Sequence, residues 1–241
     1  ALAALDEGTL DARVKADALS LALLELVLPD APPLAGTVSV DSRVQGTREA
    51  PVVTLALEGD DVAFDGGDPI DVSLAARWSD DALETTLGAR DASGPFVDAR
   101  LRAPLTQAEL ATLPTDLETW LARPIALDVD VPTRALPSLP RPLAQALPIE
   151  LGVHLEARGG ASPRVDARLA GRWLEVSRVG TCGDARPSFG AELAFDGTRA
   201  NVTSTLRDAG GEARLEASAS IPWRTWLRDG FVVPTVDATL R

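Results

Sequence analysis

The chain contains the same pattern of strands and turns twice. Residues 34–59 read LAGTVSVDSRVQGTREAPVVTLALEG, and residues 151–171 read LGVHLEARGGASPRVDARLAG. Both run glycine, alternating strand, glycine-containing turn, proline, alternating strand and glycine, and the spacing from Pro51 to Gly59 equals that from Pro163 to Gly171. A repeated β-unit of this length is typical of elongated scaffolds built from stacked copies, and not of closed catalytic domains.

The match extends over most of the chain. Leu74 pairs with Leu193 and Leu87 with Leu206 at a common offset of 119 residues, and smaller offsets upstream fit changes of loop length. We therefore predict internal repeats over approximately residues 10–123 and 124–241, within one continuous β segment covering residues 1–241. The chain does not begin with methionine, and we expect it to be a fragment of a longer protein.

Hydrophobic residues alternate with polar ones along most of the chain. This period-two pattern predicts strands with one apolar face and one solvated face, which are typical of antiparallel sheets. Short segments rich in Asp and Gly predict hairpin turns between neighbouring strands; they lie at 79–81, 91–94, 196–198 and 208–211. The sequence therefore predicts an all-β, antiparallel meander.

Two kinds of segment depart from the alternation. Residues 105–122 place leucines and a tryptophan at helical spacing, and residues 223–228 stand at the matching place in the second copy. The Leu- and Pro-rich segments 19–33 and 136–150 fit a helix, a strand or an irregular flap equally well. We expect short helical or flap insertions here.

Charge and hydropathy exclude several classes of partner. The chain has 23 Lys and Arg against 36 Asp and Glu, a net charge of −13, whereas binding to nucleic acid requires clustered basic residues. No apolar run reaches the ~18–20 residues that span a bilayer, and no signal peptide is recognisable. Any membrane anchor is expected outside this segment.

The sequence offers no convincing catalytic or metal-binding cluster. His154 is the only histidine; its alternating strand places it on the polar face, and no second ligand or orienting group stands at the expected spacing. Cys182 allows no internal disulfide. The run from Gly59 to Asp68 loosely resembles a calcium loop but lacks its bidentate glutamate. We therefore predict no catalytic residues, no metal, no cofactor and no enzymatic activity.

What remains is the repeated apolar face, which a single sheet must bury. Two interpretations stay open on the residues alone: the core of a closed β-sandwich, and an aliphatic groove suited to acyl chains. The predicted lining consists of the apolar residues of the alternating strands. These residues are Val38, Val40, Val53, Leu55, Leu57, Val72, Leu74, Leu87, Val97, Leu101, Val153, Leu155, Val165, Leu169, Leu193, Phe195, Val202, Leu206 and Leu215.

The pattern LxGxVxVxxxVxGTxxxPxVxLxLxG at 34–59 resembles the strand repeat of the AsmA/TamB family. The strand, hairpin, strand rhythm of residues 69–105 and the Leu- and Pro-rich segments before Gly36 and Gly152 also resemble that family. The resemblance implies an elongated antiparallel meander curled into an open, taco-like groove with an apolar interior. It further implies a periplasmic protein anchored in the inner membrane of a Gram-negative bacterium.

Together these observations give a functional hypothesis. We expect a segment of a bridge-like protein that carries phospholipid acyl chains along a hydrophobic β-groove towards the outer membrane. Its expected partners are phospholipid, adjoining segments of the same longer chain and outer-membrane assembly proteins, with no nucleic acid. The alternative is a closed β-sandwich that serves as a structural or assembly module, binding protein partners and no lipid.

Overall fold

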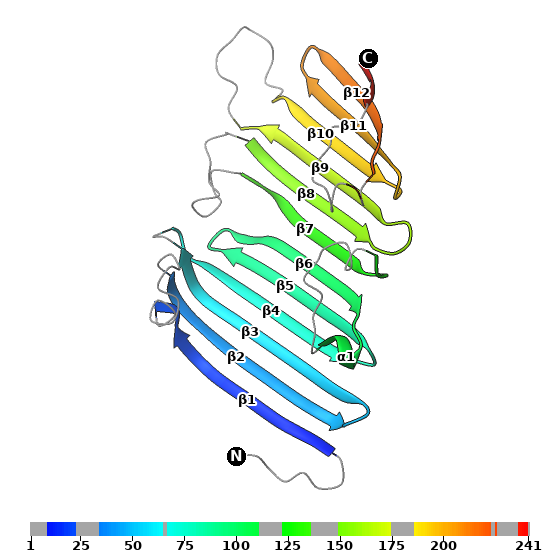
Figure 1. Cartoon of the computed structure of the whole chain (residues 1–241). Coiled ribbons are helices and arrows are strands. Elements are labelled where there is room, and N and C mark those ends of the chain that lie inside the picture. The colour runs from blue at the N-terminus through cyan, green and yellow to red at the C-terminus, as the bar shows by residue number, and fades with distance from the viewer. Residues whose placement is uncertain are drawn as a thin grey trace. The chain divides into compact units, whose positions relative to one another are not determined.

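The computed structural model describes residues 9–22, 34–64, 67–110, 122–135, 149–174, 186–222, 225 and 236–240. Its regular elements are thirteen strands and one short α-helix, which confirms the all-β prediction (Figure 1). The chain divides into two compact units. Unit 1 comprises residues 1–113 and 140–143, and unit 2 comprises residues 114–139 and 144–241.

Unit 1 is an open antiparallel meander of six strands. Each strand pairs with the next one along the chain, and the described residues show no pairing of the first strand with the sixth, so the sheet does not close. A single turn of helix follows the last strand. The elements are β1 (Thr9–Ser20), β2 (Leu34–Thr47), β3 (Pro51–Phe64), β4 (Ile70–Ser79), β5 (Ala82–Asp91), β6 (Gly94–Pro104) and α1 (Gln107–Leu110).

Unit 2 repeats this meander and adds one strand. Its pairing again follows chain order and leaves the sheet open within the described residues. Strands β1–β6 correspond in order to β7–β12, and the predicted partners Leu74 and Leu193 lie in β4 and β10. The strands are β7 (Ala126–Ala135), β8 (Ile149–Arg158), β9 (Arg164–Trp173), β10 (Ser188–Phe195), β11 (Arg199–Asp208), β12 (Gly211–Ser220) and β13 (Val236–Leu240).

The predicted hairpin turns form where Asp and Gly allow a left-handed backbone. Asp80 and Asp81 join β4 to β5 with φ values of 51° and 56°, the two-residue turn whose twist suits a hairpin. In the turn after β11, the Asp208 carboxylate accepts hydrogen bonds from the backbone N–H groups of Gly210 and Gly211 at 2.7 and 3.0 Å. These polar turns keep consecutive strands adjacent.

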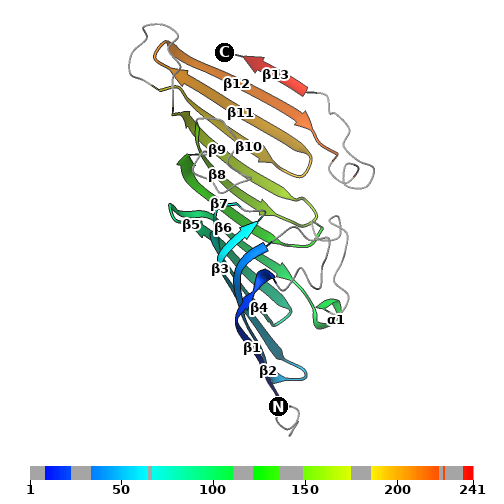
Figure 2. The same ribbon diagram turned by 90° about the vertical axis from the view of Figure 1, so that its left-hand side faces the viewer.

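Three aligned irregularities bend the sheet of unit 1. Residues with positive φ occur at Ala18 in β1 (50°), Gly36 in β2 (104°) and Asp61 in β3 (51°), where the pairing registers shift. A Cβ atom on Gly36 would lie 2.5 Å from the Asp61 carbonyl oxygen, so the two backbones approach too closely for any side chain. Bulges increase local twist and bend strands, and Figure 2 shows β1–β3 bending at this end.

Several predicted features lie partly or wholly outside the described residues. Of the predicted helical segment 105–122, the structure describes residues 105–110, including α1, and residue 122. Of the two Leu- and Pro-rich segments, only 19–22 and 149–150 are described; they belong to β1, a short 3₁₀ turn and β8. Cys182 and all of 223–228 except residue 225 also lie outside the described residues.

Candidate functional site

The register of unit 1 divides its side chains between an apolar face and a polar face. On the apolar face, Leu74 of β4 lies directly opposite Leu57 of β3 and Leu87 of β5. The same line of pairing reaches both outer strands without meeting a polar residue. We call this line the Leu74 row: Ala16, Val40, Leu57, Leu74, Leu87 and Ala99.

Unit 2 carries an equivalent line on its own apolar face. Leu193 of β10, the repeat partner of Leu74, lies opposite Ala167 of β9 and Val202 of β11. This line also crosses every strand of its unit through apolar residues alone. We call it the Leu193 row: Val129, Leu155, Ala167, Leu193, Val202, Ala217 and Ala238.

All of the residues predicted to line a groove fall on these apolar faces. The register fixes their placement, whereas their role in holding lipid stays a prediction. In unit 1 they are Val38 and Val40 of β2, Val53, Leu55 and Leu57 of β3, Val72 and Leu74 of β4, Leu87 of β5, and Val97 and Leu101 of β6. In unit 2 they are Val153 and Leu155 of β8, Val165 and Leu169 of β9, Leu193 and Phe195 of β10, Val202 and Leu206 of β11, and Leu215 of β12.

The apolar faces are incompletely covered. Leu87 is 36 % exposed, Leu206 is 48 % exposed and Leu215 is 38 % exposed. The offset of 119 residues pairs Leu87 with Leu206, but the register places Leu206 opposite Phe189 and Val202 opposite Leu193. In the part of the chain that the structure describes, no second sheet packs on either face. The buried hydrophobic residues among those described are few: Leu21, Trp78, Phe96, Ala103, Leu105, Ile149 and Ala200. The described strands therefore present aliphatic surface that protein covers only in part.

One end of the apolar face of unit 1 is closed by the chain that follows β6. Trp78 is 4 % exposed, and its Nε1–H donates a hydrogen bond to the Leu105 carbonyl oxygen at 2.5 Å. Leu105 itself is almost fully buried. Alternation along β4 places Trp78 on the same face as Leu74, but it does not predict this cover, because nothing in the alternation indicates where residue 105 packs.

A backbone hydrogen bond made by Leu105 in unit 1 has a counterpart in unit 2. The N–H of Leu105 donates to the Asp81 carbonyl oxygen at 2.8 Å, and the N–H of Ile221 donates to the Thr198 carbonyl oxygen at 2.8 Å. In both units the residue after the sixth strand thus donates a backbone hydrogen bond to the hairpin turn between the fourth and fifth strands. The sequence pattern of alternating residues did not reveal this contact.

An aromatic pair stands on the apolar face of unit 2. The rings of Trp173 and Phe189 meet edge to face with centroids 5.0 Å apart and an interplanar angle of 69°, an arrangement that aromatic quadrupoles favour. The absence of a side chain at Gly171 leaves space for the Phe189 ring, because a Cβ atom there would lie 2.4 Å from Phe189 Cζ. The sequence analysis did not include Trp173 or Phe189 in the predicted lining.

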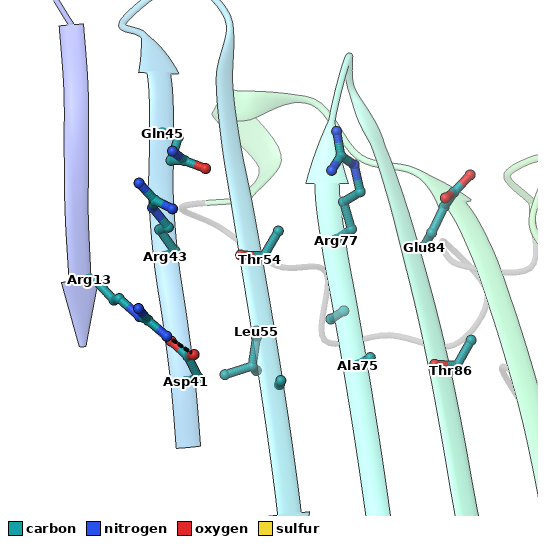
Figure 3. Close-up of a pocket in the computed structure, with 12 residues that line it drawn as sticks. Arg13, Asp41, Arg43, Gln45, Thr54, Leu55, Ala75, Arg77, Glu84 and Thr86 are labelled. Atoms are coloured by element: carbon teal, nitrogen blue, oxygen red, sulfur yellow. Dashed lines mark hydrogen bonds and ion pairs between the residues drawn. The ribbon is translucent and has the colours of Figure 1, made fainter. Parts of the chain in front are cut away.

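The polar face of unit 1 is dominated by charges paired between strands. The guanidinium of Arg13 in β1 donates hydrogen bonds to the carboxylate of Asp41 in β2 and forms an ion pair with it. This interaction holds the pKa of the Asp41 carboxyl below its usual value. Arg43 meets Asp11 at 3.2 Å in the same strand pair. Figure 3 shows the depression of about 610 Å³ that Arg13, Asp41 and Arg43 line. Charged side chains form the rim of this depression and small residues such as Ala56 and Ala75 form its floor, so it does not suit an acyl chain.

The structure shows which groups surround His154 and where two acidic segments lie. His154 lies on the polar face of β8 as predicted, but Asp130 and Glu156 lie 3.5 and 3.3 Å from its ring nitrogens, so the sequence analysis missed its neighbours. Residues 59–64 of the calcium-like run belong to β3, and the Asp80–Asp81 pair forms a turn. The potential metal-ligand cluster among the described residues involves Asp128, His154 and Glu156 instead.

Comparisons of the chain with protein-family models, curated proteins and solved structures give no match. Among the described residues, no helix is long and apolar enough to cross a membrane. The candidate site is therefore defined by the register alone, as the two apolar faces with the Leu74 row and the Leu193 row.

Proposed function

We propose that the chain is a segment of a periplasmic, bridge-like protein that carries phospholipid acyl chains on its apolar faces towards the outer membrane. The observation that carries this proposal is the unbroken apolar row across every strand of each unit. The compartment and the direction of transport rest on the resemblance to the AsmA/TamB family. Each unit supports the proposal separately.

The dimensions and chemistry of a row suit a hydrocarbon chain. Neighbouring strands lie ~4.8 Å apart, so the six strands of unit 1 give the Leu74 row a length of ~24 Å, comparable with an extended acyl chain. Each CH₂ group kept from water is worth ~0.8 kcal/mol. Ala, Val and Leu offer similar contacts at every step, so a tail bound on such a row can slide without crossing a polar barrier.

A charge in the middle of a row tests the proposal in unit 1. Leu74→Asp places a carboxylate that must stay solvated on the apolar face, and we expect it to reduce the amount of co-purifying phospholipid at least 10-fold, measured by native mass spectrometry. Ala75→Asp is the matched control, because Ala75 is the exposed neighbour on the polar face. The control is expected to retain lipid.

The same pair of changes exists in unit 2. Leu193→Asp interrupts the Leu193 row, whereas Ala194→Asp adds the same charge to an exposed position on the polar face. Folded variants are identified by circular dichroism. If folded Leu74→Asp and Leu193→Asp bind phospholipid as well as their controls, the proposal is wrong. If the unaltered chain carries no lipid and instead captures protein partners, the assembly module is the better description.

A further inference from the structure

Four side chains that could bind a metal ion or orient one of its ligands lie close together on the polar face of unit 2. Asp128 and Asp130 project from β7 at positions directly opposite Glu156 and His154 of β8. One donor atom each from Asp128, His154 and Glu156 lies within 4.8 Å of the others. Alternation along two paired strands thus brings together a nitrogen and two carboxylate ligands, although Asp128 and His154 are far apart in sequence.

The two nitrogens of His154 face different carboxylates. Nδ1 lies 3.5 Å from Asp130 Oδ1, and Nε2 lies 3.3 Å from Glu156 Oε1. A metal-bound histidine commonly uses one nitrogen for the metal and donates the other N–H to a carboxylate, which fixes its tautomer and orientation. Two ligands each ~2.1 Å from a tetrahedral ion are ~3.4 Å apart, so the separation of Nε2 and Oε1 already suits a shared ion.

The surrounding charges favour a cation at this place. Asp166 of β9 lies opposite Glu156, so Asp128, Glu156 and Asp166 form a line of three carboxylates across adjacent strands. Like charges directly opposite one another destabilise a sheet. Three arginines lie on the same face: Arg168 opposite His154, and Arg158 and Arg164 opposite each other beside Glu156 and Asp166. Against four carboxylates they leave one negative charge unbalanced.

We propose that Asp128, His154 and Glu156 bind a divalent first-row transition metal, with Zn²⁺ as the representative ion. Nε2 of His154 and one oxygen of each carboxylate are the ligands, and Asp130 is a positioning residue that holds the imidazole through Nδ1. Mixed imidazole and carboxylate ligands suit such ions, and water completes the coordination of a partly exposed site. This proposal is independent of lipid binding on the opposite face.

The single histidine makes the test unambiguous, because the imidazole signals in an NMR spectrum of the full chain come from His154 alone. Titration of metal-free protein with ZnCl₂ is expected to shift these signals and to saturate at one ion per chain. His154→Ala and Glu156→Gln are expected to weaken binding at least 10-fold by isothermal titration calorimetry. Glu84→Gln, which alters a carboxylate on the polar face of unit 1, is the control and should bind Zn²⁺ normally.

Asp130→Asn separates a positioning role from a ligand role. We expect affinity to fall roughly 10- to 100-fold while the His154 signals still shift at higher Zn²⁺ concentration, and Asp130→Glu to restore part of the affinity. The proposal is overturned if excess Zn²⁺ leaves the His154 signals unchanged, or if folded His154→Ala binds Zn²⁺ as tightly as the unaltered chain. Equal binding of Mg²⁺, insensitive to His154→Ala, would indicate a diffuse acidic surface and would also overturn it.

Discussion

The strand pair β1–β2 of unit 1 and the strand pair β7–β8 of unit 2 occupy the same place in the repeat but carry different polar faces. In the first pair, Asp11 and Asp41 each meet an arginine from the other strand. In the second pair, Asp128 lies opposite Glu156 and Asp130 lies opposite His154. Opposite charges are paired in the first strand pair, whereas acidic residues accumulate in the second, so the polar faces of these two strand pairs differ.

The apolar faces of the two units do not differ in this way. Leu74 and Leu193 lie in equivalent rows, where Leu74 faces Leu87 and Leu193 faces Val202. A repeat whose polar side varies while its apolar side stays aliphatic is expected if the apolar side performs the shared task. The ends and turns of the two units differ as well, and three sets of substitutions test these differences.

The largest effect is expected at the covered end of unit 1. The last residue on the apolar face before the turn between the fourth and fifth strands is Trp78 in β4 and Phe195 in β10, and only the tryptophan ring can donate a hydrogen bond. Trp78→Ala removes a buried indole and its hydrogen bond to Leu105, and we expect a loss of about 4 kcal/mol in the free energy of unfolding. Urea denaturation followed by circular dichroism measures it.

Trp173→Ala is the matched change in unit 2. Trp173 is only half-buried and its main aromatic contact is Phe189, so a smaller loss is expected. Equal losses in the two variants would show that the segment after β6 does not specially stabilise unit 1.

The next effect concerns the first glycine of each copy. Gly36→Ala must place a methyl group 2.5 Å from the Asp61 carbonyl oxygen at a φ of 104°, and we expect it to cost about 3 kcal/mol in the free energy of unfolding. Gly94→Ala is a control for backbone strain alone, because Gly94 has a φ of 113° and open space around it. It should cost only about 1 kcal/mol.

Gly152→Ala tests whether the two first glycines are equivalent. Its new methyl group would meet chiefly the Thr133 side chain, with Oγ1 at 2.4 Å and the Thr133 backbone at 3.2 Å. Because a hydroxyl can rotate away, we expect a smaller loss than for Gly36→Ala. If Gly152→Ala lowers the free energy of unfolding more than Gly36→Ala does, this expectation is wrong.

Period-two alternation was sufficient to predict the strands that carry the lining residues and the face on which those residues lie. Alternation fixes faces without knowledge of the partner, because successive side chains point to opposite sides. The turns at 79–81 and 196–198 were predictable for the same local reason, since Asp and Gly tolerate positive φ.

The remaining features depend on pairing between strands. The bend involves Ala18, a residue that carries no turn signal of its own, and the covering of Trp78 depends on where Leu105 packs. The cluster around His154 required the register of β7 against β8. The alternation of Leu127, Val129 and Val131 with acids was the signal that could have identified β7 as a strand.

The smallest effect is expected at the turn between the fourth and fifth strands of each copy. In unit 1 this turn holds Asp80 and Asp81 in the left-handed region. In unit 2 the Asp196 carboxylate accepts hydrogen bonds from the backbone N–H groups of Arg199 and Thr198 at 2.8 and 3.0 Å and from the Thr198 hydroxyl at 2.9 Å. These donors lower the pKa of Asp196 from its ordinary value of 3.8.

Because the folded pKa is depressed, the carboxylate of Asp196 stabilises unit 2 above about pH 3.8, and this stabilisation is lost as the pH falls through the folded pKa. Asp196→Ala is therefore expected to lower the urea midpoint at neutral pH and to have progressively less effect below pH 3.8. Thr198→Val keeps the carboxylate and the backbone donors but removes the hydroxyl, so it should show a weaker form of the same pH dependence. A difference between Asp196→Ala and the unaltered chain that stays constant with pH would mean that the turn of unit 2 is held by Gly197, with its φ of 96°, and not by the carboxylate. The turns of the two units would then be stabilised in the same way, by residues with positive φ and by the backbone hydrogen bond from the residue after the sixth strand.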